Sequence, residues 1–414
     1  MRLVVVGASL AGLRAAQAAR AAGHDGELVV VGEERHLPYT RPPLSKELLQ
    51  GAHEADGCAF PCDDLDVAWR LGEAATGLDP AAREVALAGG ERLPFDALVI
   101  ATGCRARPWT GPGAELDGVH TIRHLDDAIA LRAALTTRPA PRLAIVGAGF
   151  IGCEVAASVR GLGVDVTLID VAPLPMPALG PLLGEHCARM HREHGVDLRL
   201  GAGIAALRGD GRVEAVELED GTRVDADVVV VALGAIPNTE WLAGSGLTLD
   251  PGVACDAHLA AVGTTGVYAA GDVASWPHPL AGGARIRVEH WTNAAEQGTI
   301  AGRHAVAGED GERAPHVAVP SFWSDQYDAK IQAIGLPRLA RHVEVVEAAP
   351  EGDRFVAVGE RDGRVVAALA VNGARRLPWY RRRVADGVTL DALRAELADD
   401  PKAFGPPAAR EVVG

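Results

Sequence analysis

The sequence predicts an α/β protein with two similar domains built on parallel sheets and a smaller α+β domain after them. A short apolar run that ends in a glycine turn and leads into a helix occurs twice, as LVVVGASLAG at residues 3–12 and as LAIVGAGFIGCE at residues 143–154. The chain has 414 residues, 48% of them hydrophobic, so it can bury two or three separate cores. Strand patterns such as VEVV at residues 343–346 and VVAALAV at residues 365–371 predict the α+β domain, in residues 316–414.

The bulk composition excludes several classes of protein. A net charge of -15 disfavours nucleic acid as the main partner, because phosphate binding needs clustered Lys and Arg. No apolar run reaches the roughly 18–20 residues that span a bilayer, and no targeting segment is recognised at the N-terminus. The cysteines form no metal-binding pairs and fit reduced thiols in the cytosol, so we expect a cytoplasmic protein. They are Cys58, Cys62, Cys104, Cys153, Cys187 and Cys255.

The first glycine turn lies between a strand at residues 3–6 and a helix that follows it, and residues 28–31 form the next strand. In such a βαβ unit, Gly7 permits the tight turn and Gly12 lets the helix pack closely on the strand. The helix N-terminus then offers free N–H groups and a positive dipole end to a pyrophosphate. Ser9 occupies the position that usually carries a second glycine, with Ala11 after it.

The second turn matches the GxGxxG pattern in full through Gly147, Gly149 and Gly152, and its next strand ends in Asp170. That carboxylate is placed to accept hydrogen bonds from a ribose 2′-hydroxyl and to repel a 2′-phosphate, so NADH is favoured over NADPH. No Arg or Lys for a 2′-phosphate follows in residues 171–176. In the first copy the equivalent position is Gly32, and Glu33 is the expected ribose ligand.

One glycine turn of this kind also occurs for packing alone. Two copies, each in a complete βαβ unit with an acidic residue near the end of the second strand, indicate two dinucleotide-binding sites. We call residues 7–12 with Glu33 the first cradle and residues 147–152 with Asp170 the second cradle. We expect one to hold a permanently bound dinucleotide and the other a dinucleotide that exchanges.

Seven segments, in order and at similar spacing from residue 1 to about 385, resemble the FAD-dependent ferredoxin reductases of oxygenase systems. This family includes putidaredoxin reductase, rhodocoxin reductase and the reductase of biphenyl dioxygenase. The segments are GASLAG, RPPLSK, ATG, GAGFIGCE, GVYAAGDVA, VEHWTNAAEQG and SFWSDQYD. The resemblance implies a glutathione-reductase-like architecture, with an FAD domain (residues 1–108 and 241–315), an inserted NAD domain (109–240) and a C-terminal domain (316–414). It also implies FAD as the bound cofactor, NADH as the donor, and an iron–sulfur ferredoxin that serves a P450 or a ring-hydroxylating oxygenase as the acceptor.

The resemblance assigns roles to single residues. Lys46 would lie near flavin N5 and pair with Glu154, where a cation stabilises the reduced flavin; the alternative is a surface lysine on a loop. Phe150 would cover the flavin until nicotinamide displaces it, or it is a core phenylalanine. His290 and Trp323 also fall in motifs near the flavin, although an aromatic in a core explains each as well. The other residues expected to contact a cofactor are Arg41, Ala75, Arg123, Gly234, Asp272 and Trp291.

Five arginines interrupt the acidic sequence near the C-terminus, at Arg375, Arg376, Arg381, Arg382 and Arg383. They are interpreted either as a docking patch for an acidic ferredoxin or as a solvated helix face.

Two other classes stay open from the sequence. One is a rubredoxin reductase, or an NADH oxidase or peroxidase, of the same fold. The peroxidase would need a redox cysteine near RPPLSK, where the nearest candidate position carries Ser45. The other is a redox-sensing binding protein similar to apoptosis-inducing factor. Residues 11–22 contain no cysteine, which argues against the dithiol chemistry of disulfide reductases.

Overall fold

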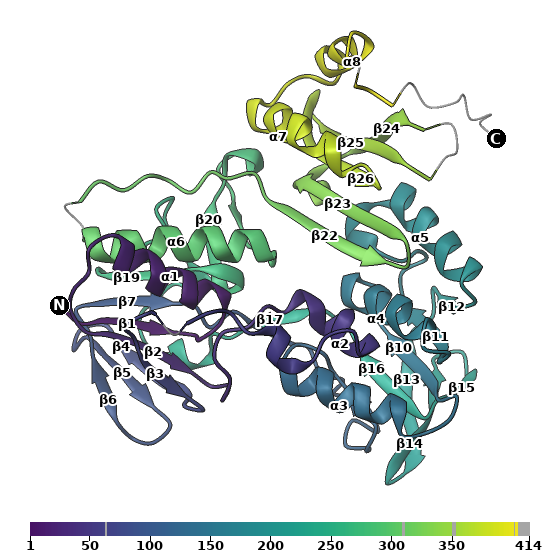
Figure 1. Cartoon of the computed structure of the whole chain (residues 1–414), viewed down its shortest axis with the longest axis horizontal. Helices are drawn as coiled ribbons and strands as arrows, with labels where there is room; N and C mark the ends of the chain where they lie inside the picture. Colours follow the sequence, from purple (N-terminus) through teal and green to yellow (C-terminus); the bar gives the residue numbers. More distant parts are fainter. Residues whose placement is uncertain (63, 309–310, 350–352, 401, 405–414) are drawn as a thin grey trace. The chain divides into compact units, whose positions relative to one another are not determined.

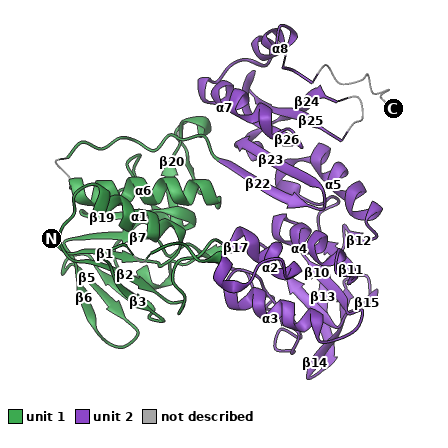
Figure 2. Cartoon of the chain, viewed as in Figure 1, with its two compact units in different colours: residues 1–40, 58–105, 236–320 green, residues 41–57, 106–235, 321–414 purple. Residues whose placement is uncertain are grey.

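The computed structural model describes residues 1–62, 64–308, 311–349, 353–400 and 402–404. The chain folds into two compact units (Figure 2). The first unit comprises residues 1–40, 58–105 and 236–320, and the second comprises residues 41–57, 106–235 and 321–414. Among the described residues, no helix combines the length and the apolar character needed to cross a membrane.

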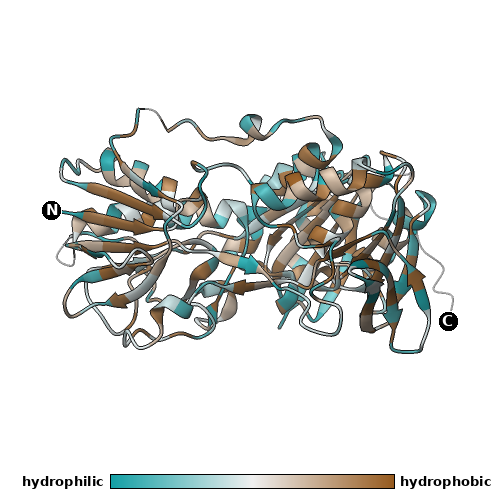
Figure 3. Ribbon diagram, turned by 90° about the horizontal axis from the view of Figure 1, so that it is seen from below, coloured by the Kyte–Doolittle hydropathy of each residue, from teal (hydrophilic) through white to brown (hydrophobic). Residues whose placement is uncertain are grey.

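A parallel five-stranded sheet forms the centre of the first unit (Figure 1). Each of its three inner strands is buried on both faces or nearly so, which is why these strands are apolar runs rich in Val, Leu and Ile. The order across the sheet is β19 (Val267–Ala269), β7 (Ala97–Ile100), β1 (Leu3–Val6), β2 (Leu28–Gly32) and β3 (Ala68–Leu71). The strands near the N-terminus are accordingly coloured as hydrophobic in Figure 3.

Two helices, α1 (Leu10–Ala21) and α6 (Trp291–Ala307), pack against each other beside this sheet. Their contact is close because α6 carries glycine where the backbones approach. A Cβ on Gly298 would lie 2.2 Å from the carbonyl oxygen of Ala11, and a Cβ on Gly302 would lie 2.2 Å from that of Ala15. Residues far apart in the sequence therefore hold the helix of the first glycine turn.

Smaller sheets complete the first unit. An antiparallel sheet contains β4 (Ala75–Asp79), β5 (Glu84–Leu87) and β6 (Arg92–Pro94). A mixed sheet contains β18 (Val253–Ala254), β20 (Ala274–Pro277) and β21 (Arg285–Ile286). The strands β8 (Cys104–Ala106) and β17 (Ala235–Pro237) include the points where the chain passes from one unit to the other.

The second unit repeats the parallel architecture. Its sheet has the order β12 (Asp197–Leu200), β11 (Asp165–Asp170), β10 (Arg142–Val146), β16 (Val228–Val231) and β9 (Val119–His120). An antiparallel sheet of β13 (Ile204–Asp210), β14 (Arg212–Leu218) and β15 (Arg223–Asp225) shares a core with it. The helices are α2 (Glu47–Gln50), α3 (Leu125–Thr136), α4 (Phe150–Arg160) and α5 (Pro181–Glu193).

An antiparallel sheet with two helices forms the C-terminal part of the second unit. The strand order is β22 (Ser321–Gln326), β23 (Ala329–Gly335), β26 (Arg364–Val371), β25 (Phe355–Arg361) and β24 (His342–Ala348). The helices α7 (Leu377–Asp386) and α8 (Leu390–Ala398) follow. The α/β class with two parallel-sheet regions and a C-terminal α+β region is thus confirmed.

The units differ from the predicted domain bounds at residues 41–57 and, by a few residues, at 106–108, 236–240 and 316–320. Residues 41–57 contact α3 and α4 and therefore group with the second unit, and so does β22, which contacts α4. A grouping by contacts is not a division into domains, so the three-domain division stays a prediction. Residues 405–414 of the predicted C-terminal domain lie outside the described residues.

Candidate functional site

The first cradle has the geometry of a tight strand-to-helix turn. Gly7 has a φ of +123°, and a Cβ there would lie 2.1 Å from the carbonyl oxygen of Ala101. A Cβ on Gly12 would lie 1.9 Å from the carbonyl oxygen of Gly7. Ser9 is the N-cap of α1, whose first turn carries no acidic residue. The free N–H groups of this helix end thus face a site where an anion is stabilised.

The second cradle repeats this backbone. Gly147 has a φ of +108°, and a Cβ on it would lie 2.3 Å from the carbonyl oxygen of Ala232. A Cβ on Gly152 would again lie 1.9 Å from the carbonyl oxygen of the first glycine of the turn. Gly149 is the N-cap of α4, and no atom lies within 4 Å of a Cβ built on it. Both turns therefore present a helix N-terminus in the same backbone geometry, and the second leaves open space beside Gly149 for a phosphate group.

The two cradles differ where their second strands end. Asp170 accepts a hydrogen bond from the backbone N–H of Ala148 at 2.6 Å and one from that of Ala172 at 2.8 Å, one on each carboxylate oxygen. Each oxygen keeps a second lone pair for a ribose hydroxyl. In the first cradle this position is Gly32, and a Cβ there would lie 2.5 Å from the Cβ of Ala8. The next residue, Glu33, is exposed.

Asp272 lies beside the first cradle. It follows Gly271, where a Cβ would lie 3.0 Å from the Cβ of Ala11 on α1. The Asp272 side chain is buried and accepts a hydrogen bond from the thiol of Cys104 at 3.2 Å. The backbone N–H of Gly271 donates to Gln297 of α6 at 2.9 Å. This carboxylate is therefore fixed at the end of β19, next to the helix that would receive a pyrophosphate.

The other residues expected to contact FAD lie in both units. In the first unit, Ala75 begins β4 and Trp291 begins α6, with His290 as the N-cap of that helix. In the second unit, the guanidinium of Arg41 donates to the backbone carbonyl of Arg123 at 2.5 Å, so the structure brings these two residues together.

Lys46 and Glu154 form a buried ion pair within the second unit, with 2.7 Å between Nζ and Oε2. Only 7% of Lys46 and 4% of Glu154 are exposed, so Lys46 is not a surface lysine on a loop. Glu154 also accepts hydrogen bonds from Ser45 at 2.5 Å and from Ser324 of β22 at 2.8 Å. A buried charge needs a partner and further hydrogen bonds, and Lys46, Ser45 and Ser324 together supply them to the Glu154 carboxylate.

Phe150 and Gly234 lie at the second cradle. Phe150 is half-buried and packs edge-to-face on Phe322 of β22, with 4.7 Å between ring centroids. Gly234 has a φ of +87°, and no atom lies within 4 Å of a Cβ built on it. Three large apolar residues beside this turn are exposed: Ile151 (41%), Leu233 (36%) and Val171 (75%). The second cradle thus offers an accessible apolar surface to planar rings.

A buried histidine ties the tip of the β22–β23 hairpin to α5. His191 lies within hydrogen-bonding distance of the Tyr327 hydroxyl, with 3.0 Å between Nδ1 and the oxygen, and His194 stacks on the tyrosine ring. Burial lowers the pKa of His191 to about 4. Burial also raises the pKa of Tyr327. This hairpin is therefore packed against the second parallel sheet region by neutral groups.

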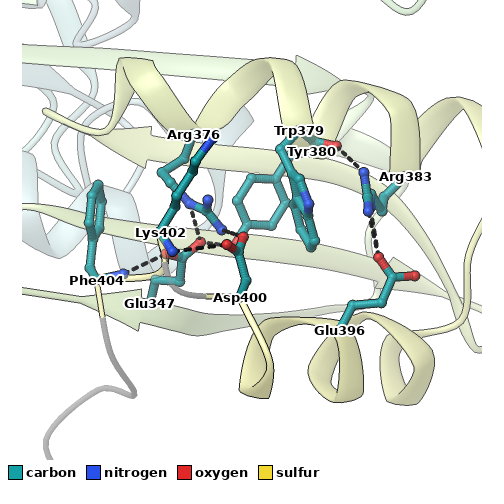
Figure 4. A network of polar contacts seen from close by, with 9 residues as sticks. All are labelled: Glu347, Arg376, Trp379, Tyr380, Arg383, Glu396, Asp400, Lys402 and Phe404. Atoms are coloured by element: carbon teal, nitrogen blue, oxygen red, sulfur yellow. Dashed lines mark hydrogen bonds and ion pairs between the residues drawn. The ribbon is translucent and has the colours of Figure 1, made fainter.

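The structure corrects the interpretation of the five arginines as one docking patch, because several of them have partners within the protein (Figure 4). Arg376 is 5% exposed and forms ion pairs with Glu347 at 3.0 Å and with Asp400 at 2.9 Å, so it is not available for docking. Arg383 lies over the Trp379 ring and pairs with Glu396 at 2.7 Å. Arg381 donates to Ser321 at 2.6 Å. Only Arg375 and Arg382 of the five are exposed.

Sequence reasoning missed the roles of Ser324, Gln326 and Cys104. Ser324 and Gln326 lie two positions apart on β22, so their side chains are on the same face of the strand, and Gln326 donates to Ser324 at 3.1 Å. Both belong to the SFWSDQYD segment, so the sequence motif marked this strand, but it did not indicate that Ser324 contacts Glu154. Ser45, which the sequence presents only as the position of a missing cysteine, is a hydrogen-bond donor to Glu154.

The fold and the two glycine turns define an oxidoreductase with two dinucleotide sites. Residues 1–298 match the family model described as pyridine nucleotide-disulphide oxidoreductase, and residues 321–403 match the one described as reductase C-terminal. The chain belongs to the pyridine nucleotide-disulphide oxidoreductase family. Its members use FAD and a nicotinamide dinucleotide, which the two cradles fit.

Relatives narrow the family further. The chain is 38% identical, over 96% of each sequence, to the ferredoxin–NAD(+) reductase component of the anthranilate 1,2-dioxygenase system of Burkholderia cepacia. Two crystal structures are each 30% identical to it. The ferredoxin reductase for the CYP199A2 system of Rhodopseudomonas palustris has a TM-score of 0.89 and covers 98% of each chain. Putidaredoxin reductase in its covalent complex with putidaredoxin has a TM-score of 0.87 and covers 95% of each chain. The resemblance inferred from the sequence is thus confirmed.

Proposed function

We propose that the chain is an NADH-dependent ferredoxin reductase that holds FAD at the first cradle and binds NADH at the second. When bound, FAD accepts two electrons as a hydride from NADH and passes them on one at a time, which suits an iron–sulfur acceptor. The acceptor is a ferredoxin that serves a P450 or a ring-hydroxylating oxygenase, as in the relatives' systems.

One observation carries this assignment: the two cradles share a backbone, yet only in the second is the last residue of the second strand a carboxylate, Asp170, whereas the first has Gly32 there and the exposed Glu33 one residue later. Asp170 keeps lone pairs for the two ribose hydroxyls of NADH, and its charge opposes a 2′-phosphate. The exposed apolar side chains of Ile151, Val171 and Leu233 support a ligand that comes and goes. Near the first cradle the corresponding residues differ, because Leu10 and Ala11 are buried and Ala11 lies against Gly298 of α6.

The remaining residues would orient the reactants. Asp272 would accept hydrogen bonds from the ribityl or pyrophosphate region, and Arg41, Ala75, Arg123 and Trp291 would contact FAD as well. Glu154 holds Lys46 in place, and this lysine would stabilise negative charge on the reduced flavin. Phe150 would give way when nicotinamide arrives, while Gly234 leaves space on that side.

The alternatives receive less support. A peroxidase would need a redox cysteine where Ser45 is buried and bonded to Glu154. All six cysteines lie within the described residues, are buried and form no disulfide there, so none offers an accessible thiol.

A direct assay tests the proposal. With purified protein, NADH should bleach the yellow chromophore without oxygen, and electrons should reach a ferredoxin faster than a rubredoxin or molecular oxygen. The proposal fails if the protein is colourless and cannot be reconstituted with FAD. It also fails if the chromophore stays oxidised under NADH, or if oxygen is the preferred acceptor.

We further propose a docking patch that is smaller than the five-arginine cluster and consists of its two exposed members, Arg375 and Arg382. Acidic ferredoxins would be attracted to it over a screened distance. Replacing both with glutamate should raise the KM for ferredoxin about 3- to 10-fold at low salt and leave dye reduction by NADH unchanged. Arg341→Glu, at another exposed arginine of the C-terminal sheet region, is the matched control. Equal loss of both activities would refute the docking role.

A further inference from the structure

We propose that Cys104 is a positioning residue for the flavin cofactor: its thiol fixes the Asp272 carboxylate at the first cradle before FAD binds. This inference rests on the proposed function, in which Asp272 receives a hydrogen bond from FAD. It gives a role to one of six cysteines that the sequence leaves unexplained.

Three neighbouring parallel strands of the first unit, β1, β7 and β19, end at the same edge of the sheet. The turn after β1 contains Gly7, the turn after β7 contains Ala101, and the turn after β19 contains Gly271. A Cβ on Gly7 would lie 2.1 Å from the Ala101 carbonyl oxygen, and one on Gly271 would lie 3.0 Å from the Ala11 Cβ. The second and third turns therefore press directly on the first cradle.

Cys104 joins the second of these turns to the third. It directly follows Ala101–Thr102–Gly103, and its Sγ donates to Oδ2 of Asp272 at 3.2 Å. Only 3% of Cys104 and 8% of Asp272 are exposed. Because little water reaches this carboxylate, a protein donor decides how it is oriented.

The turn after β7 is itself held from the other side. The Thr102 hydroxyl donates to the Asn238 carbonyl at 2.8 Å, and the Asn238 side chain donates to the Thr102 carbonyl at 2.9 Å. The backbone N–H of Asn238 donates to the Gly103 carbonyl at 3.0 Å. The thiol thus projects from a braced backbone, which makes it a fixed donor.

The second unit supplies an internal comparison. There the turn after β16 reads Ala232–Leu233–Gly234, and the residue that corresponds to Cys104 is Ala235. Beyond β16 lies β9 rather than a strand followed by a Gly–Asp turn. A thiol is therefore present beside the cradle that has a Gly–Asp carboxylate to orient, and alanine takes its place beside the other cradle.

A thiol is a weak donor, so its effect lies in pre-organisation rather than in bond strength. A carboxylate that is already aimed at the ligand loses little rotamer freedom when the ligand binds. Without the thiol, Asp272 gains alternative orientations, and FAD should leave more readily.

The test compares three variants of the holoenzyme by the rate at which FAD is released, followed as the rise in free-flavin fluorescence. Cys104→Ala should release FAD about 3- to 10-fold faster, the range expected for one weak hydrogen bond. Cys104→Ser, which keeps a donor, should lie between this variant and the natural protein. Cys255→Ala is the matched control, because Cys255 is equally buried in the same unit but donates to the Val253 carbonyl at 3.4 Å. Unchanged release from Cys104→Ala, or equally fast release from Cys255→Ala, would overturn the inference.

A second measurement separates positioning from a general loss of packing. Asp272→Asn should accelerate release, and adding Cys104→Ala should accelerate it little further, because a positioning thiol acts through the carboxylate. Fully additive effects would contradict this role. If the natural protein bound FAD and was reduced by NADH while Cys104→Ala behaved identically, only this inference would fail; a natural protein without FAD would instead refute the proposed function.

Discussion

In both cradles a Cβ on the last glycine of the turn would lie 1.9 Å from the carbonyl oxygen of the first, yet the side chains around the two turns differ. Gly32 and Arg14, beside the first cradle, correspond to Asp170 of the second cradle and to Glu154 beside it. The repeated backbone satisfies what any pyrophosphate needs, namely a close approach to helix N–H groups. The differing side chains decide which dinucleotide binds, how long it stays, and which charges lie near the reacting rings.

The largest effect should come from adding a methyl group to the first glycine of each turn. Gly7→Ala and Gly147→Ala both place a Cβ within about 2.3 Å of a carbonyl oxygen at positive φ, so each backbone must shift. Gly7→Ala should purify without FAD. Gly147→Ala should keep its yellow colour but be reduced by NADH about 100-fold more slowly. Absorbance spectra and stopped-flow reduction measure the two outcomes. The same defect in both variants would contradict the division of roles between the cradles.

The next effect concerns the charged position on each helix. Glu154→Gln leaves Lys46 buried without its counter-charge and should lower the free energy of unfolding by about 3–5 kcal/mol. Arg14→Gln beside the first cradle removes a half-buried side chain that donates to Gln17 of the same helix, and should change it by about 0.5 kcal/mol or less. Urea unfolding measures both. Comparable losses would show that the ion pair is no more important to folding than its counterpart.

Acid should weaken both units over the same pH range. Burial lowers the pKa of His191 in the second unit, and that of His316 in the first, to about 4 each. Since the unfolded value is near 6.5, the unfolded chain binds more protons below that pH. The full stability is present above about pH 6.5, and each histidine should remove about 1.4 kcal/mol per pH unit down to about pH 4. His191→Asn should flatten this slope, whereas a substitution at the exposed His53 should not. An unchanged slope in His191→Asn would show that the histidine is not neutral in the folded state.

The smallest effect tests nucleotide choice. Asp170→Ser removes the carboxylate that distinguishes the second cradle from the first. It should lower kcat/KM for NADH about 10-fold, because hydrogen bonds to a charged group are lost, and it should raise the value for NADPH. The ratio of the two values from steady-state assays is the measurement. A preserved preference for NADH would place the selectivity elsewhere.

The sequence predicts the two βαβ units well, because the last glycine of each turn is dictated by a contact with the first glycine of the same turn. A Cβ on Gly12 or Gly152 would clash with a carbonyl oxygen only a few residues earlier in the chain, so a local sequence pattern is enough to predict that glycine is required there. The burial of Arg376 could not be predicted from a local pattern. Its partner Glu347 lies on β24, and nothing in the run of arginines indicates which one points inward.

The same limit applies to the candidate site. The pairing of Lys46 with Glu154 follows from a resemblance, but its support from Ser324 depends on a strand that follows 170 residues later. Likewise, the approach of Cys104 to Asp272 requires β7 and β19 to be neighbours in the sheet. Such contacts follow from topology, which short motifs do not encode.

The glycines of α6 also affect how the protein is made. Because Gly298 and Gly302 press against α1, the first-unit fold is incomplete until the ribosome has synthesised the chain beyond Ala307. The parallel sheet of the second unit needs nothing beyond Val231 and emerges earlier. We therefore expect the N-terminal strands to remain incompletely paired while the sheet of the second unit, which comes later in the sequence, folds first. We also expect chaperones to bind these N-terminal apolar strands during translation.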